Sequence, residues 1–132
     1  MNGWAVIPAI RVRDMGVALD FYQNMLGFSL DRGGPSEDNC SLSRGGAKIM
    51  LETPADFYST AYNTAIESRL GSPSAIALYI EEPDLEDLHR RLVDAGVVIV
   101  DPPADRPWGQ AEFTIEDAER NWLTFWKAIE TT

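Results

Sequence analysis

The sequence predicts an α+β protein built from two βαβββ modules, at about residues 1–65 and 70–132 of one domain spanning 1–132. Two observations predict this fold class. The same order of elements (strand, helix, glycine stop, strand and hairpin) occurs twice along the chain. Equivalent positions also keep a similar separation: Gly27 and Gly96 are 69 positions apart, and Ile49 and Leu123 are 74 apart. A chain of this length can bury the core of a single domain.

The first module opens with a strand predicted over residues 5–12, where Pro8 indicates an edge position or a bulge. Asp14 is a good N-cap for the helix that follows, and Gly27 supplies its left-handed end. An apolar stripe recurs at helical spacing at Met15, Ala18, Leu19, Tyr22, Met25 and Leu26. Further strands are expected at residues 28–31, 39–43 and 47–52.

The segment 53–74 interrupts this pattern, because Phe57, Tyr58 and Tyr62 stand in a polar background rich in Ser and Thr. We interpret it as a linker or flap carrying a short helix, since long loops are often functional. The second module then repeats the first. It has a strand at 75–80, a helix with an apolar stripe at Leu85, Leu88, Leu92 and Ala95, and a strand at 97–100.

The final stretch contains a hairpin predicted from two runs rich in aromatic and β-branched residues, 111–116 and 122–127. Strand alternation places Trp122, Thr124 and Trp126 on one face and Leu123 and Phe125 on the other. An aromatic face opposite a core face suggests a wall for a flat, greasy or cationic ligand. Plain core filling explains the same pattern equally well. Before the hairpin, residues 107–109 (PWG) form a rigid corner around Trp108.

The composition excludes several classes of function. The net charge of −10 should repel nucleic-acid phosphates and attract a cationic ligand, although it could serve only to keep the protein in solution. Neither a membrane-spanning run nor a signal segment is found, so we expect no membrane partner and a cytoplasmic location. The lone Cys40 cannot form an internal disulfide.

Three stretches together resemble the vicinal oxygen chelate superfamily, which includes glyoxalase I, extradiol dioxygenases, and fosfomycin- and bleomycin-resistance proteins. They are residues 7–28 (IPAIRVRDMGVALDFYQNMLGF), 84–97 (DLEDLHRRLVDAGV) and 107–125 (PWGQAEFTIEDAERNWLTF). The resemblance covers nearly the whole chain. It implies curved mixed sheets around a cleft.

Metal-using members of the superfamily hold the ion on the first and last strands of each module. The matching positions here are Ile7 and Ala75 on first strands, and Met50 and Thr124 on last strands. These are not usual ligands for a hard or borderline cation. The single histidine, His89, lies in the second predicted helix. We therefore expect neither a metal nor another cofactor.

Within the superfamily the chain is most similar to the bleomycin-resistance branch. The resemblance rests on Ile7-Pro8 in place of the first-strand histidine, on the corner around Trp108, and on the acidic charge. It implies a homodimer whose crevices sequester a cationic, aromatic antibiotic of the bleomycin type without altering it. The alternative is a glyoxalase- or dioxygenase-like enzyme of the same superfamily.

The four metal positions of the superfamily face its cleft. Because side chains alternate along a strand, residues an even number of positions away from them on the same strand are predicted to face the cleft as well. Arg11 falls on this face of the first strand. Glu52 and Glu112 are the acids expected to bind a cation, unless both are rim residues in water; Glu52 could also be a lone general base. The predicted ligand-binding residues are Met50, Glu52, Tyr79, Trp108, Glu112, Thr114, Trp122, Thr124 and Trp126.

The turn at residues 117–121 (DAERN) departs from the superfamily's usual Asp-Pro-Asp-Gly-Asn. Arg120 stands where the glycine would take a positive φ, which costs steric energy for any other residue. We therefore expect a turn of different shape.

Overall fold

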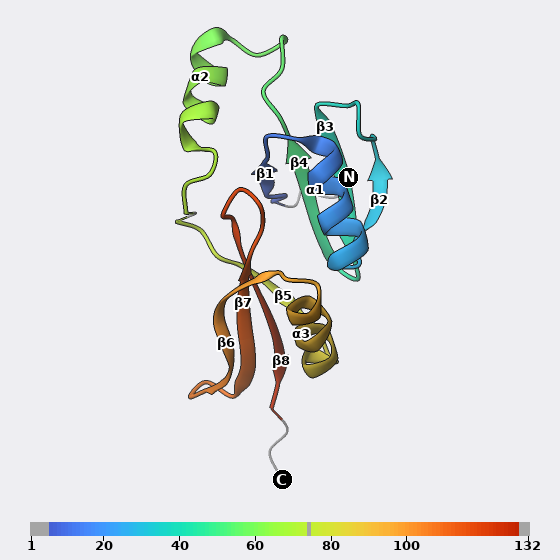
Figure 1. The fold of residues 1–132 in the computed structure, drawn as a ribbon, viewed down its shortest axis with the longest axis vertical. Coiled ribbons are helices and arrows are strands. Elements are labelled where there is room, and N and C mark those ends of the chain that lie inside the picture. Colours follow the sequence, from blue (N-terminus) through green and yellow to red (C-terminus); the bar gives the residue numbers. More distant parts are fainter. Residues whose placement is uncertain (1–5, 74, 130–132) are drawn as a thin grey trace, which may run out of the picture. The chain divides into compact units, whose positions relative to one another are not determined.

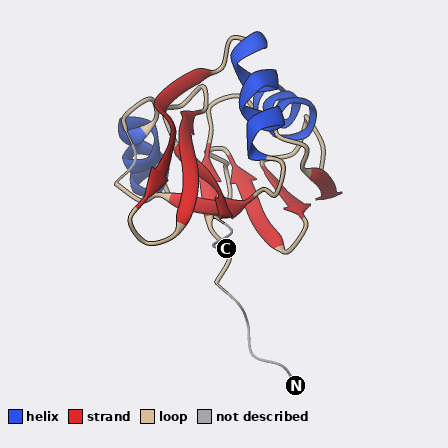
Figure 2. Ribbon diagram, turned by 90° about the horizontal axis from the view of Figure 1, so that it is seen from below, coloured by secondary structure: helices blue, strands red, loops and turns tan. Residues whose placement is uncertain are grey.

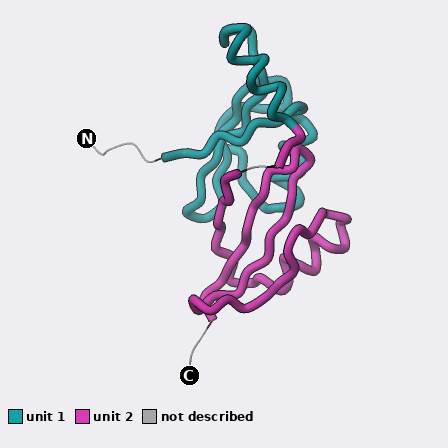
Figure 3. Tube along the Cα trace, turned by 90° about the vertical axis from the view of Figure 1, so that its left-hand side faces the viewer, with its two compact units in different colours: residues 1–70 teal, residues 71–132 magenta. Residues whose placement is uncertain are grey.

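The structure is a computed structural model that describes residues 6–73 and 75–129 of the chain. It divides into two compact units, residues 1–70 (unit 1) and 71–132 (unit 2), coloured separately in Figure 3. Within the described residues each unit contains one four-stranded sheet, in the order β1-β4-β3-β2 and β5-β8-β7-β6. Each sheet joins one parallel pair to antiparallel pairs. The predicted α+β fold with two βαβββ modules is confirmed.

Unit 1 contains the first module and the segment that follows it (Figure 1). Helix α1 continues into one turn of π-helix, η1, and α2 comes after the last strand. The elements are β1 (Ala9–Arg11), α1 (Met15–Asp20), η1 (Phe21–Met25), β2 (Ser29–Arg32), β3 (Asn39–Arg44), β4 (Ala47–Glu52) and α2 (Thr60–Arg69).

The ends of the first helix are set by the residues that the sequence indicated. The Asp14 side chain accepts a hydrogen bond from the backbone N–H of Val17 at 3.1 Å, and Gly27 takes a φ of +79° after the last turn. One side of this helix is buried against one face of the sheet. The core comprises Ile10, Met15, Ala18, Leu19, Tyr22, Leu26, Leu42, Ile49 and Leu51.

The first strand is shorter than predicted. Residue 5 lies outside the described residues, Ile7 precedes the strand, and β1 begins only at Ala9. Pro8 has no N–H to donate to a neighbouring strand, although its carbonyl accepts from the backbone N–H of Met50 at 2.9 Å. The ladder therefore starts one residue after the proline.

The segment after β4 carries a helix, as expected. Ser59 caps α2 by accepting from the backbone N–H of Tyr62 at 3.1 Å. Ile66 is the one fully buried side chain of α2. This helix thus contributes little apolar packing, in contrast to α1.

Unit 2 repeats the arrangement with α3 over its sheet; strands are red and helices blue in Figure 2. Helix α3 packs on β6 and β8. The elements are β5 (Leu78–Glu81), α3 (Leu85–Asp94), β6 (Val98–Arg106), β7 (Gln110–Glu116) and β8 (Trp122–Ala128). The core between helix and sheet comprises Ile80, Leu85, Leu88, Leu92, Phe113, Ile115, Leu123 and Phe125.

Two strand boundaries in unit 2 differ from the prediction. β5 begins at Leu78, so Ala75 and Ala77 lie outside it, because its first partner is Leu123 and β8 itself starts only one residue earlier. β6 runs on through Pro102 and Pro103 instead of ending at residue 100. β6 is an edge strand whose register shifts on both sides of Asp101, and such positions accept prolines.

The hairpin turn at residues 117–121 corrects another expectation. Arg120 takes a φ of +65°, the one positive value at a non-glycine residue in the described part of the chain. The side chain of Asp117 holds this turn, because it accepts from the backbone N–H groups of Glu119 at 2.9 Å and Asn121 at 2.8 Å. Arginine thus adopts the glycine conformation instead of changing it.

Candidate functional site

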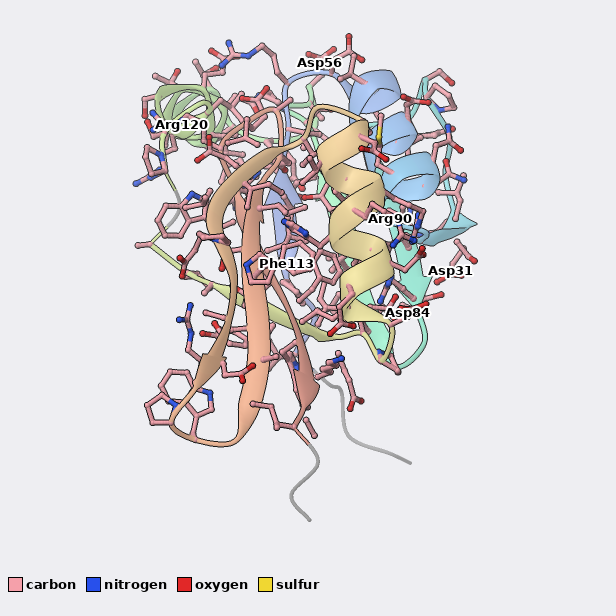
Figure 4. The ribbon with its side chains drawn as sticks, turned by 60° about the horizontal axis from the view of Figure 1, so that its bottom comes forward. Asp31, Asp56, Asp84, Arg90, Phe113 and Arg120 are labelled. Atoms are coloured by element: carbon pink, nitrogen blue, oxygen red, sulfur yellow. The ribbon has the colours of Figure 1, made fainter. Side chains whose placement is uncertain are left out.

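The strand register of unit 2 brings most of the predicted site residues onto one face of the sheet. Phe113, labelled in Figure 4, comes from β7 on the side of α3, where its ring meets that of His89 at 5.1 Å. Alternation therefore directs the neighbouring residues of β7 to the opposite face. We call this opposite face the tryptophan face. Its members on the three paired strands are Tyr79, Glu81, Gln110, Glu112, Thr114, Glu116, Trp122, Thr124, Trp126 and Ala128.

Two threonine hydroxyls lie at the centre of the tryptophan face. Thr114 and Thr124 are direct cross-strand partners, and their Oγ1 atoms are 2.7 Å apart. Only 3% of Thr124 is exposed. The two hydroxyls satisfy each other, as buried polar groups must. Tyr79 is the partner of Thr124 on β5 and is 54% exposed.

Glu112 is a buried acid with distant partners. It is 4% exposed, yet Arg106 Nε lies 3.8 Å from its Oε2, and Gln110 Nε2 donates to its Oε1 at 3.4 Å. Trp126 stands opposite Glu112 on β8 and is half-buried. A carboxylate and an indole ring thus lie side by side on this face.

The other two predicted tryptophans occupy different surroundings. Trp122 is half-buried, and its Nε1 donates to Glu116 Oε2 at 2.9 Å across the hairpin. Trp108 lies in the turn between β6 and β7, where Gly109 has a φ of +88° and donates to Arg106 O at 3.1 Å. At 63% exposed, Trp108 stands outside the strand pairing that defines the tryptophan face.

The remaining two predicted residues, Met50 and Glu52, belong to β4 of unit 1. Glu52 is the strand partner of Arg11 on β1, so Met50, Glu52 and Arg11 lie on the same face of the sheet. Glu52 is buried and fully engaged. Its Oε1 accepts from Arg11 Nε at 3.0 Å, and its Oε2 accepts from the Tyr58 hydroxyl at 3.1 Å. The Tyr62 hydroxyl accepts from Arg11 at 3.0 Å and approaches Glu52 at 3.4 Å. We call these four residues the Glu52 cluster.

The contacts of the Glu52 cluster raise the pKa of two of its members, Arg11 and Tyr58. The hydrogen bond to Tyr62 is the largest cause that raises the pKa of Arg11, and the Glu52 charge adds to it. Burial raises the pKa of the Tyr58 phenol, and the hydrogen bond to Glu52 raises it further. Both effects favour a charged arginine and a neutral phenol beside the carboxylate.

Tyr58 and Tyr62 were not among the predicted site residues, although both stand out in the polar segment 53–74. Their ring centroids are 4.3 Å apart, as the four-residue spacing across the start of α2 allows. That spacing, with the N-cap Ser59 between the two tyrosines, was the signal available in the sequence. The partner carboxylate on β4 was not visible in it.

The four superfamily metal positions do not form a donor set. Ile7 and Ala75 have no donor atom in their side chains, Met50 offers only a thioether, and the Thr124 hydroxyl is hydrogen-bonded to that of Thr114 at 2.7 Å. Across residues 6–73 and 75–129, no three His, Cys, Asp or Glu side chains gather as a metal ion would require. The residues present do not fit a metal at this place.

The chain matches the Glyoxalase/Bleomycin resistance protein/Dioxygenase superfamily over residues 5–125. It belongs to this superfamily. A search among curated proteins gives no significant match. Nor does any helix in the described residues have the length and apolar character needed to cross a membrane.

Solved structures share this fold at low sequence identity. TioX from Micromonospora sp. ML1 is 22% identical, with a TM-score of 0.73 over 96% of this chain and 100% of that one. A superfamily member from Sphaerobacter thermophilus is 23% identical, with a TM-score of 0.66 over 93% and 97%. A bleomycin-binding protein complexed with bleomycin is 16% identical, with a TM-score of 0.68 over 95% and 98%.

Proposed function

We propose that this protein binds a cationic, aromatic small molecule without transforming it, in the manner of an antibiotic-sequestering protein. The observation that carries the proposal is the pairing of Glu112 with Trp126 on the tryptophan face. The carboxylate supplies a charge for a cation, and the indole supplies a surface for a flat ring. Both belong to adjacent strands, so their spacing is set by the sheet.

The distribution of charge supports a cationic ligand. Unit 2 contains thirteen acidic and five basic residues, whereas unit 1 contains eight and six. Most of the net charge of −10 therefore belongs to the unit that carries Glu112. Such an excess attracts cations and raises their local concentration.

The ligand proposal extends to a bleomycin-type antibiotic, supported by the fold shared with a protein that was solved with bleomycin. Around Glu112 and Trp126 we propose contacts from the other residues of the tryptophan face and from Trp108, whose ring is exposed at the adjoining turn. The Glu52 charge is already matched by Arg11, so we assign the cation to Glu112.

A titration of tryptophan fluorescence with bleomycin tests the proposal. We expect saturable quenching at one ligand per chain. Glu112→Gln should weaken binding about tenfold, because it removes a charge-assisted contact. Trp126→Leu should weaken it about fivefold by removing the stacking surface.

Glu119→Gln is the matched control for Glu112→Gln, because it removes the same charge from the hairpin turn. It should leave the affinity nearly unchanged. Absence of quenching at high micromolar bleomycin would discard the antibiotic as ligand. A stoichiometric divalent ion retained through purification would instead favour the enzymatic alternative.

We also propose a homodimer, as the superfamily resemblance implies. β5 forms an edge of its sheet and carries the exposed ring of Tyr79, a surface that suits a second chain. Light scattering on the purified protein should give twice the chain mass of 14.7 kDa. A monomer at every concentration would contradict this.

A further inference from the structure

The charge of Glu112 is buried but loosely compensated. Its two partners stand at 3.8 Å (Arg106) and 3.4 Å (Gln110), near the outer limits for an ion pair and a hydrogen bond. Glu52, the corresponding buried acid of unit 1, has partners at 3.0 and 3.1 Å. The cluster around Glu52 is closed, whereas Glu112 retains capacity for a closer partner.

Arg106 also contacts a second carboxylate, that of Asp101. Its terminal nitrogen donates to Asp101 Oδ2 at 2.5 Å, also from β6. The side chain of Asp101 is half exposed, while that of Glu112 is buried. Arg106 is therefore held closely by the solvent-exposed acid and distantly by the buried one.

We propose that Arg106 is the specificity-determining residue of the ligand site, and this inference rests on the function proposed above. In the free protein Arg106 compensates the Glu112 charge. A ligand cation replaces it there, and Arg106 stays paired with Asp101. Neither arginine nor glutamate is left without a counter-charge in this exchange.

The same geometry selects against neutral ligands. A neutral ring placed against Trp126 would separate Arg106 from Glu112 without supplying a positive charge. It would leave a buried carboxylate uncompensated, which is strongly unfavourable. Discrimination then comes from a penalty on the wrong ligand as well as from attraction of the right one.

A double-mutant cycle tests the role of Arg106, with bleomycin as the cationic probe and tryptophan fluorescence as the readout. Arg106→Gln should tighten binding about three- to tenfold, because the ligand no longer competes with an internal cation. In the Glu112→Gln background the same substitution should have no effect. The test is the difference between the effects of Arg106→Gln in the two backgrounds, which measures the coupling between Arg106 and Glu112.

Arg90→Gln is the matched control, since it removes the same charge from α3, on the other face of the sheet (Figure 4). Asp101→Asn supplies a second test at an exposed residue that should fold normally. Without its second partner, Arg106 should stay on Glu112 and binding should weaken about threefold. Asp94→Asn on α3 is the control for that change.

The possible results separate the two proposals. If the wild type binds bleomycin and Arg106→Gln acts as Arg90→Gln does, or weakens binding, the role of Arg106 is refuted and the binding function stands. An equal effect of Arg106→Gln in both Glu112 backgrounds would also refute it. If only the Arg106→Gln chain binds, the role of Arg106 is supported. Binding by none of the chains would overturn both proposals.

Discussion

Arg120 has a backbone conformation that favours glycine. Its φ of +65° lies in the left-handed region, where a Cβ atom meets the backbone. The turn is held in this shape by the Asp117 side chain, and Arg120 Nε lies 3.7 Å from Glu116. That exposed ion pair contributes little. The strain is therefore only partly offset.

Replacing Arg120 with glycine should stabilise the protein. We expect Arg120→Gly to raise the free energy of unfolding by about 1 kcal/mol, because glycine adopts a positive φ without steric cost. Urea denaturation measures this change. Arg90→Gly inside α3 is the control and should lower the free energy of unfolding by about 1 kcal/mol. A loss of stability in both variants would show that Arg120 is not strained.

Helix α2 is attached to its unit mainly by polar contacts. Tyr58 and Tyr62, at the start of the helix, reach Glu52 and Arg11 on β4 and β1. Ile66 adds the one fully buried side chain of the helix. Elements with so few apolar contacts open at low free energy. Because the Tyr58 hydroxyl must keep its proton to donate to Glu52, the attachment of α2 depends on the protonation of the Tyr58 phenol.

The raised pKa of Tyr58 predicts a loss of stability at alkaline pH. The neutral phenol is favoured in the folded protein, so its contribution is complete below the ordinary tyrosine value of about 10. It is lost as the pH rises through the higher folded pKa. Hydrogen exchange of the α2 amides should therefore accelerate above about pH 10. The acceleration should exceed the base-catalysed increase expected for the α3 amides, which serve as the internal reference.

Tyr58→Phe should remove this alkaline component while exchanging faster than the wild type at neutral pH, because it lacks the hydrogen bond to Glu52. The control is Tyr79→Phe, which changes an exposed ring in unit 2. An unchanged alkaline profile in Tyr58→Phe would assign the effect to another group.

The whole chain is acidic, but its charge is unevenly distributed, with the excess in unit 2. Salt should therefore weaken the proposed binding of a cation. The Debye length falls from about 30 Å at about 0.01 M to about 3 Å at about 1 M salt. Bleomycin titrations over this range should show a steady fall in affinity, smaller in Glu112→Gln. An affinity independent of salt would argue for binding by ring stacking alone.

Much of the fold could be predicted from local sequence. The N-cap at Asp14, the positive φ of Gly27 and the two faces of β8 all follow from short-range rules. Alternation has a period of two residues, so it needs no knowledge of the partner strands. For the same reason six of the predicted site residues share one face of the sheet in unit 2.

Pairing between distant segments was decided only by the tertiary structure. β5 starts at Leu78 because β8 starts at Trp122, and β6 continues past its prolines because β7 accommodates its register shifts. The partners of the two buried acids depend on the same long-range contacts. Glu52 meets two tyrosines from the segment that follows it, and Glu112 meets Arg106 across a bulged ladder. Composition and spacing can indicate a buried carboxylate. Which side chain supplies its counter-charge depends on the distant segments that the fold brings next to it.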